Sequence, residues 1–195
     1  TIMKTVLITG ASKGIGAEIA RTLAKEGYNV AINFNKSESA AVALKNELEK
    51  YTSVMLVKAD VSKYDEVASM VSAVRNKFGS ITHLVCNAGI SVTGLLEDMD
   101  LCQCDSVIDT NLKGVIYTVK EVIPDMVKRK SGVIVNVSSI WGMHGASCEV
   151  AYSASKAAVI GLTRALAKEL GPSGVRVNCI APGVIDTRMM DEHSN

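Results

Sequence analysis

The sequence has no excess of charge of either sign and no long hydrophobic run. Its 21 Lys and Arg residues nearly balance 20 Asp and Glu residues, which leaves a formal net charge of +1. Such a balance produces no broad electrostatic field of the kind that attracts nucleic acid or an acidic membrane. No apolar run approaches the ~18 residues that span a bilayer. The apolar segment at residues 5–9 leads directly into a glycine turn without a cleavage site, which indicates a first strand and not a signal peptide.

Cysteine and histidine are few and scattered, with five and three residues respectively. An odd, dispersed set of cysteines indicates free thiols in a reducing cytoplasm, where we expect the protein to reside. Cys102 and Cys104 supply only half of a tetrahedral site, so we expect no bound metal. The sequence also lacks a G-x-x-x-x-G-K-S/T motif, which argues against a nucleoside triphosphatase.

The sequence does contain a regular alternation of two hydrophobic periods. Its 195 residues, 48% hydrophobic and 21% charged, suit one domain with a full-sized core, spanning residues 1–195. Short β-branched runs, typical of strands buried on both faces, occur at residues 5–9, 29–34, 53–58, 82–86, 132–137 and 175–180. Apolar residues recur at helical spacing in residues 15–26, 38–50, 65–78, 104–130 and 151–170. This alternation predicts a Rossmann-type doubly wound parallel sheet in three α/β/α layers.

Ligands of such sheets bind beyond the carboxyl ends of the strands, so the residues after each strand are the candidates for a site. The first strand is followed by TGASKGIG, in which glycines allow a tight turn and a close approach of the backbone to a pyrophosphate. A purely structural glycine turn is the alternative. The residues that we expect to hold a cofactor here are Gly10, Ser12, Lys13, Gly14, Ile15 and Gly16.

The choice of dinucleotide depends on the end of the second strand. An NAD site places an acidic residue there for the ribose 2′-OH, whereas this chain has Asn35 and Lys36, with Lys13 in the glycine loop. Two cations without an acid suit a 2′-phosphate, so we predict NADP(H), unless both lysines are merely exposed.

The third and fourth strands end in two further candidate segments. After the third strand, Asp60 can accept a hydrogen bond from the adenine amino group while Val61 packs against the ring, or Asp60 can belong to a helix N-cap region. After the fourth, Asn87, Ala88 and Gly89 combine a polar side chain with two small residues, which lets the backbone close on the cofactor.

In this order, the motifs resemble those of the short-chain dehydrogenase/reductase family along the whole chain. The resemblance rests on Gly10-x-x-x-Gly14-x-Gly16, Asn87-Ala88-Gly89, Asn111 in DTNLKG, Ser139 in VNVSSIWG, Tyr152 and Lys156 in YSASK, and Pro182-Gly183 in APGVIDT. Cys86 stands where a second Asn is common in the family. The family implies reduction of a carbonyl by hydride transfer from a nicotinamide cofactor.

The resemblance implies a role for each polar residue of the site. Tyr152 and Lys156 are four residues apart and share one helix face. An ammonium group nearby, like an oxidised nicotinamide, lowers the pKa of a phenol from ~10 toward neutral pH. Tyr152 is then the proton donor, and Lys156 lowers the pKa of its phenol and binds the nicotinamide ribose. Ser139 donates a hydrogen bond to the substrate oxygen. Asn111 is expected to hold a water molecule that connects Lys156 to bulk solvent, so that the proton can be replaced. Ser138 is the rival of Ser139, which the family spacing favours.

After the last predicted strand, the resemblance implies that a further segment covers the nicotinamide. Pro182 and Gly183 belong to it, with Ile185 contributing its backbone and Thr187 its hydroxyl. Members of the family usually continue through a substrate-covering segment, another helix and a last strand. We expect that C-terminal helix and strand to be missing here, which would expose a sheet edge.

The motifs TGASKGIG, NLKG and YSASKA are most similar to those of 3-oxoacyl-(acyl carrier protein) reductases, which implies a small or carrier-bound ketone substrate in fatty acid synthesis. The loop at residues 171–174 lacks the basic residue that such enzymes often present to the acidic carrier. Lys128, Arg129 and Lys130 could compensate, or could simply form a solvated helix end. SSIWGMHGASCEVAYS resembles instead a bacterial branch that reduces a ketone on a modified lysine of elongation factor P. A non-catalytic NADP(H)-binding sensor is a third alternative.

The family also implies a homodimer or homotetramer through the helices at residues 104–130 and 151–170. The interface candidates, unless they only face the sheet, are Val115, Val119, Ala158, Leu162 and Leu166.

Overall fold

A computed structural model of the chain describes residues 3–185. Its six strands form one sheet in the order β3-β2-β1-β4-β5-β6, and every neighbouring pair is parallel. The strands are β1 (Thr5–Ile8), β2 (Asn29–Phe34), β3 (Val54–Lys58), β4 (His83–Cys86), β5 (Gly132–Val137) and β6 (Val175–Ile180). The strand order reverses between β1 and β4, which opens a crevice at their carboxyl ends. The predicted doubly wound parallel sheet is confirmed.

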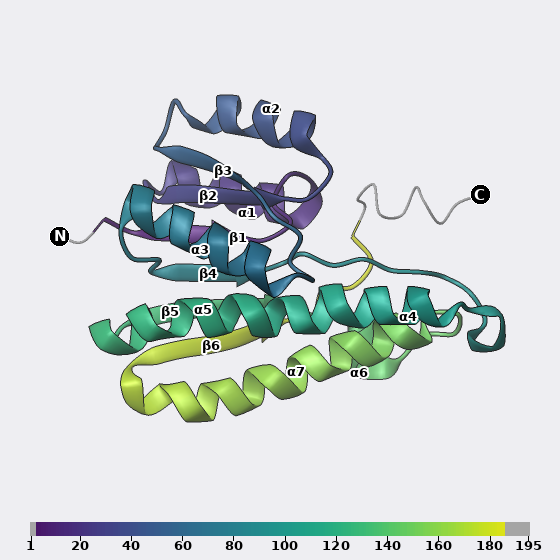
Figure 1. Cartoon of the computed structure of the whole chain (residues 1–195). Helices are drawn as coiled ribbons and strands as arrows, with labels where there is room; N and C mark the ends of the chain where they lie inside the picture. The colour runs from purple at the N-terminus through teal and green to yellow at the C-terminus, as the bar shows by residue number, and fades with distance from the viewer. Residues whose placement is uncertain (1–2, 186–195) are drawn as a thin grey trace.

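Helices cover both faces of this sheet, as Figure 1 shows. They are α1 (Gly14–Lys25), α2 (Glu38–Leu48), α3 (Tyr64–Phe78), α4 (Leu101–Ile108), α5 (Gly114–Arg129), α6 (Ile140–His144) and α7 (Val150–Leu170). Short 3₁₀ turns occur at η1 (Leu96–Asp98) and η3 (Gly171–Ser173), and a π turn at η2 (Asp109–Lys113) joins α4 to α5. Helices α1 and α2 pack on one face, and α3, α5 and α7 pack on the other.

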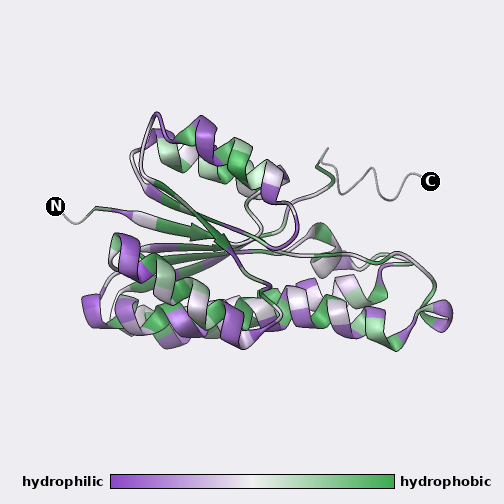
Figure 2. Cartoon of the chain, turned by 45° about the horizontal axis from the view of Figure 1, so that its top comes forward, coloured by the Kyte–Doolittle hydropathy of each residue, from purple (hydrophilic) through white to green (hydrophobic). Residues whose placement is uncertain are grey.

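The strands are buried on both faces because successive side chains enter opposite layers. In β1, Val6 and Ile8 pack with α1 and α2, whereas Leu7 between them packs with α3, α5 and α7. All three are fully buried, and each burial stabilises the fold by about 1.5–3 kcal/mol. Figure 2 shows the strands mostly in the colour of hydrophobic residues, between helices that carry both colours.

The long helix predicted at residues 104–130 differs from the observed structure in two ways. It begins at Leu101, because Asp100 and Gln103 form a capping box that satisfies the first backbone N–H groups. It is also interrupted by η2, whose wider turn has no signature in the hydrophobic pattern. Helix α6 was not predicted, since five residues are too few to show a period.

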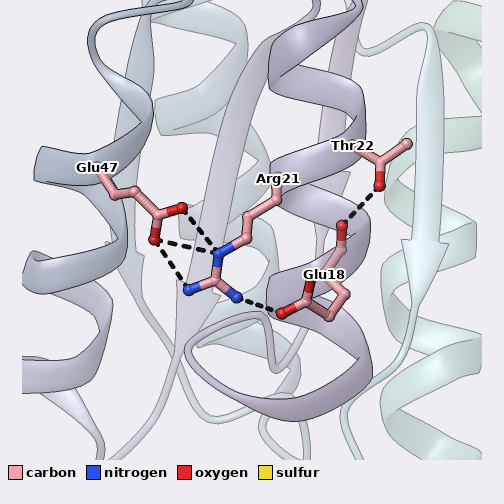
Figure 3. Close-up of polar contacts among 4 residues, drawn as sticks. All are labelled: Glu18, Arg21, Thr22 and Glu47. Carbon is pink, nitrogen blue, oxygen red and sulfur yellow. Dashed lines mark hydrogen bonds and ion pairs between the residues drawn. The ribbon is translucent and has the colours of Figure 1, made fainter.

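On the surface, Arg21 ties α1 to α2. Its guanidinium donates to both carboxylate oxygens of Glu47 at 2.9 Å and to Glu18 at 2.5 Å, and Figure 3 shows this fork between the two helices. Exposed pairs of this kind contribute ~0–1 kcal/mol, so the pair orients α2 more than it stabilises the fold. Within residues 3–185, no helix is long and apolar enough to cross a membrane.

Candidate active site

The glycine loop after β1 packs backbone to backbone against the segment after β4. Gly10 has a φ of +61°, and a Cβ built on it would lie 2.7 Å from the Cα of Ala88. A Cβ on Gly16 would lie 2.6 Å from the Asn87 side-chain nitrogen. Both glycines are therefore required by shape, and the loop lies directly at the crevice between β1 and β4.

Thr9 and Asn87 fasten these two segments together. The Asn87 side chain donates to the carbonyl oxygens of Thr9 and Gly10, both at 3.0 Å. The Thr9 hydroxyl in turn accepts from the backbone N–H groups of Asn87 at 3.0 Å and Ala88 at 3.1 Å. The side chain of Asn87 thus shapes the loop, and its predicted contact with a cofactor stays a prediction.

Asn33, at the buried end of β2, holds the same loop from the other side. Its side-chain oxygen accepts from the backbone N–H of Gly10 at 3.1 Å, and its amide donates to the carbonyl of Ala59 at 3.1 Å. Because these bonds are buried and link three strand ends, Asn33 positions the loop and is not itself exposed to a ligand.

The cations expected to select the dinucleotide lie on the surface beside this loop. Lys13, Asn35 and Lys36 are all exposed, and neither lysine makes an ion pair with a residue in the described range. Their amines are accessible to a phosphate group, as the sequence argument requires.

Asp60 closes the turn between β3 and α3. Its carboxylate accepts from the backbone N–H of Ser62 at 3.0 Å and from the Ser62 hydroxyl at 2.7 Å. Burial works to raise the pKa of Asp60, but the hydrogen bonds from Ser62 and Asn35 outweigh it and hold the pKa below its usual value. Val61 is buried against Gly114. The structure shows the turn, and contacts of either residue with adenine stay a prediction.

Lys156 lies in the second turn of α7 with its ammonium group buried under the segment after β4. Its Nζ donates to the carbonyl of Val137 at 2.9 Å and lies 5.6 Å from the centre of the Tyr152 ring. The residue is 4% exposed, and burial lowers the pKa of its ammonium to about 8. No described acid pairs with it, and two of its three N–H donors have no described partner. Such a group suits a ligand that offers hydroxyl oxygens.

The surroundings of Tyr152 shift the pKa of its phenol. Burial raises the pKa of the Tyr152 phenol, the Ser139 hydroxyl opposes this shift, and the Glu149 carboxylate adds to it. The ammonium group of Lys156 donates to the Val137 carbonyl, and its predicted lowering of the phenol pKa stays a prediction.

The two adjacent serines have different surroundings. Ser138 donates its hydroxyl to the backbone carbonyl of Lys156 at 2.8 Å, which ties β5 to α7. Ser139 caps α6 by accepting from the backbone N–H of Trp141 at 3.2 Å, and its hydroxyl also contacts Tyr152. Ser139 is therefore the serine beside the phenol.

Asn111 reaches the site from the π turn between α4 and α5. Its side chain accepts from the N–H of Ile90 at 2.8 Å, donates to the carbonyl of Ile90 at 2.9 Å, and donates to the Ser155 hydroxyl at 3.0 Å. A π turn shifts the side chains that follow it around the helix axis, and such turns are common at functional sites. The predicted role of Asn111 in holding a water stays a prediction.

The segment after β6 begins at the edge of this group. The carbonyl of Pro182 accepts from the N–H of Ile140 at 2.9 Å, so the segment is held against the start of α6. Gly183 and Ile185 are exposed. Thr187 lies outside the described residues.

The structure decides between alternatives that the sequence left open for two surfaces. Val115 and Val119, named as candidates for a subunit interface, are buried against the sheet, and Leu162 and Leu166 pack on the same core. An oligomer stays a prediction without these valines. The basic cluster at residues 128–130 ends α5 at the amino edge of the sheet, where Arg129 donates to the carbonyl of Ile81. It lies at the opposite edge from the site and cannot line its entrance.

Two residues of the site were missed by sequence reasoning. Gly142 lets α6 lie directly on α7, because a Cβ there would be 2.7 Å from the carbonyl carbon of Lys156. Glu149 bonds to the loop after β4. Gly142 stands in SSIWG, where a glycine hints at close packing, whereas nothing in the pattern around Glu149 distinguishes it from a surface acid.

The fold and the site define a Rossmann-type α/β domain with its polar residues gathered at the switch point of the sheet. A family model described as short chain dehydrogenase matches residues 4–195, and the chain belongs to that family of oxidoreductases.

Curated relatives agree with this assignment. The 3-oxoacyl-(acyl-carrier-protein) reductase FabG of Staphylococcus epidermidis is 45% identical over 193 residues, which cover 98% of this chain and 79% of the relative. The FabG of Chlamydia trachomatis is 42% identical over 191 residues, covering 96% of this chain and 76% of the relative. The uncharacterized oxidoreductase YmfI of Bacillus subtilis is 41% identical over 191 residues, covering 97% and 78%.

Proposed function

We propose that the protein is an NADPH-dependent ketone reductase acting on 3-oxoacyl groups carried as thioesters. The observation that supports the proposal most directly is the buried ammonium group of Lys156 beside the Tyr152 ring and beneath Gly89. The names of the FabG relatives support the substrate class.

The residues present fit a nicotinamide dinucleotide. Gly10 and Gly16 allow a backbone cradle at the start of α1, and Lys156 has donors to spare for ribose hydroxyls. Lys13 and Lys36 are accessible to a 2′-phosphate. When bound, the reduced nicotinamide supplies the hydride.

The residues of the chain orient the substrate and supply the proton. The Ser139 hydroxyl, next to the phenol, orients the substrate oxygen by a hydrogen bond. As negative charge develops on that oxygen, the O–H bond of Tyr152 breaks and its proton passes to the oxygen, leaving a phenolate. The ammonium group of Lys156 stabilises this phenolate electrostatically and is itself held by the Val137 carbonyl.

The test is consumption of NADPH with an acetoacetyl thioester, followed by absorbance. We expect turnover with NADPH to be more efficient than with NADH. Tyr152→Phe should reduce turnover by orders of magnitude while NADPH still binds. Tyr51→Phe, at an exposed position in the turn after α2, is the matched control and should leave turnover unchanged.

Other outcomes would contradict parts of the proposal. Near-normal turnover by Tyr152→Phe would remove the proton-donor assignment, and equal use of NADH would remove the cofactor preference. NADPH binding without turnover on any ketone would favour the sensor. Turnover of a ketone attached to a protein lysine, but not of a thioester, would favour the elongation factor P substrate.

A further inference from the structure

Glu149 is the residue immediately before α7, three positions from Tyr152, and its side chain does not cap its own helix. Its carboxylate instead accepts a hydrogen bond from the Thr93 hydroxyl at 3.0 Å and another from the Ser91 hydroxyl. Both hydroxyls belong to the strip of residues 90–94, which follows the candidate cofactor segment of β4. The two oxygens of one carboxylate therefore join two parts of the chain that meet beside the phenol.

The 90–94 strip is fastened at both of its ends. At one end the Asn111 side chain holds both backbone groups of Ile90. At the other end the N–H of Gly94 donates to the carbonyl of Cys148 at 2.9 Å, next to Glu149. Cys148 has a φ of +62°, a conformation that is uncommon for a residue with a side chain. Hydrogen bonds at both ends therefore hold the strip against the start of α7.

Glu149 also carries a charge that no described cation neutralises. Burial is the main cause that raises the pKa of Tyr152, the Ser139 hydroxyl opposes it, and the Glu149 carboxylate raises it further. Of the other titratable groups around this pair, Lys156 lies on the same helix, and Cys86 of β4 and Cys179 of β6 act on Lys156. Glu149 is thus an acid whose charge acts on the phenol.

We propose that Glu149 is a positioning residue, whose carboxylate fastens the 90–94 strip to the start of α7 and holds a negative charge beside the Tyr152 phenol. The proposal rests on the proposed function in one respect, because the charge matters to turnover only if the phenol delivers the proton. A neighbouring negative charge disfavours the phenolate. Glu149 therefore keeps the phenol protonated, and so competent for reduction, to higher pH than Lys156 and Ser139 alone would allow.

Glu149→Gln separates charge from shape, since the amide oxygen can still accept from one hydroxyl while the amide nitrogen donates to the oxygen of the other. In the pH profile of kcat/KM for ketone reduction, we expect the fall at alkaline pH to begin earlier in this variant. The kcat/KM of the variant should be about threefold below that of the parent protein at alkaline pH and equal to it near neutral pH. Ser91→Ala combined with Thr93→Val keeps the charge of Glu149 and removes the hydrogen bonds to its carboxylate. We expect the KM for the ketone to rise severalfold while the pH profile of kcat/KM stays unshifted.

A titration without substrate keeps the test independent of the reaction. Tyrosinate absorbance, taken as the difference between each protein and its Tyr152→Phe counterpart, reports the ionisation of this phenol alone. We expect Glu149→Gln to ionise at lower pH than the parent, even if no ketone is reduced. An unchanged titration would overturn the electrostatic role, and an unchanged KM in the double variant would overturn the bracing role.

Discussion

The side chain of Asn111 pairs with both backbone groups of Ile90, accepting from the N–H at 2.8 Å and donating to the carbonyl at 2.9 Å. This pairing takes the place of a neighbouring strand for a segment that has left the sheet. It also brings Gly89 against the site, since a Cβ there would lie 3.2 Å from the Lys156 Nζ and 3.3 Å from the Asn111 side-chain oxygen. One amide thus sets the distance between the cofactor segment and the lysine.

Replacement of Asn111 by Ala should destabilise the protein by about 2–4 kcal/mol, because the N–H and the carbonyl of Ile90 and the Ser155 hydroxyl lose a buried partner. We expect a lower midpoint in urea and a loss of turnover. Asn46→Ala, on the exposed face of α2, is the control and should be close to neutral. Equal midpoints for the two variants would show that Asn111 does not brace the segment.

Gly142 and Gly161 provide a second matched pair. A methyl group on Gly142 would press on the α7 backbone at Lys156, so Gly142→Ala should cost about 1–3 kcal/mol and should weaken turnover by displacing that lysine. Gly161 is an exposed position within α7 with nothing near its Cβ direction, so Gly161→Ala should stabilise the fold by up to ~1 kcal/mol. Unfolding in urea and turnover of both variants check the pair, and full activity in Gly142→Ala would contradict the packing argument.

The buried ammonium of Lys156 predicts a pH dependence of stability. Its pKa falls from 10.5 to about 8 on folding, so between these values the unfolded chain binds more protons. Stability from this group is therefore fully present above pH 10.5 and is lost as the pH falls to about 8. The free energy of unfolding of the parent protein, minus that of Lys156→Met, should rise with pH across this window.

Cys86 has the opposite effect on the pH dependence of stability, because burial raises the pKa of its thiol from 9.0 to about 12. It is present in both proteins of this comparison and cancels in the difference. A difference that stays flat or falls with pH would show that the ammonium group is not desolvated in the folded protein.

Some site residues were predictable from the sequence, and others were not. Gly10 and Gly16 were recognisable because a tight turn after a strand leaves few residue types possible. The roles of Tyr152 and Lys156 came from the family resemblance, and helical spacing showed only that they share one face. Val115 and Val119 were misjudged as interface candidates, since periodicity shows that a position is apolar without showing what covers it. The raised pKa of Tyr152 was also missed, because it depends on burial and on the Glu149 carboxylate, which no local pattern shows.

The sequence by itself determined the parallel sheet, since apolar strands alternating with amphipathic helices have few other ways to bury both faces. It also determined the glycine loop and the Tyr–Lys pair, whose geometry is local. Only the tertiary structure decided that Asn111 braces Ile90, 21 residues away, and that Glu149 bonds to Ser91, 58 residues away. Contacts between such distant residues depend on how α4, α5 and α7 pack against the end of β4, and no local pattern records that packing.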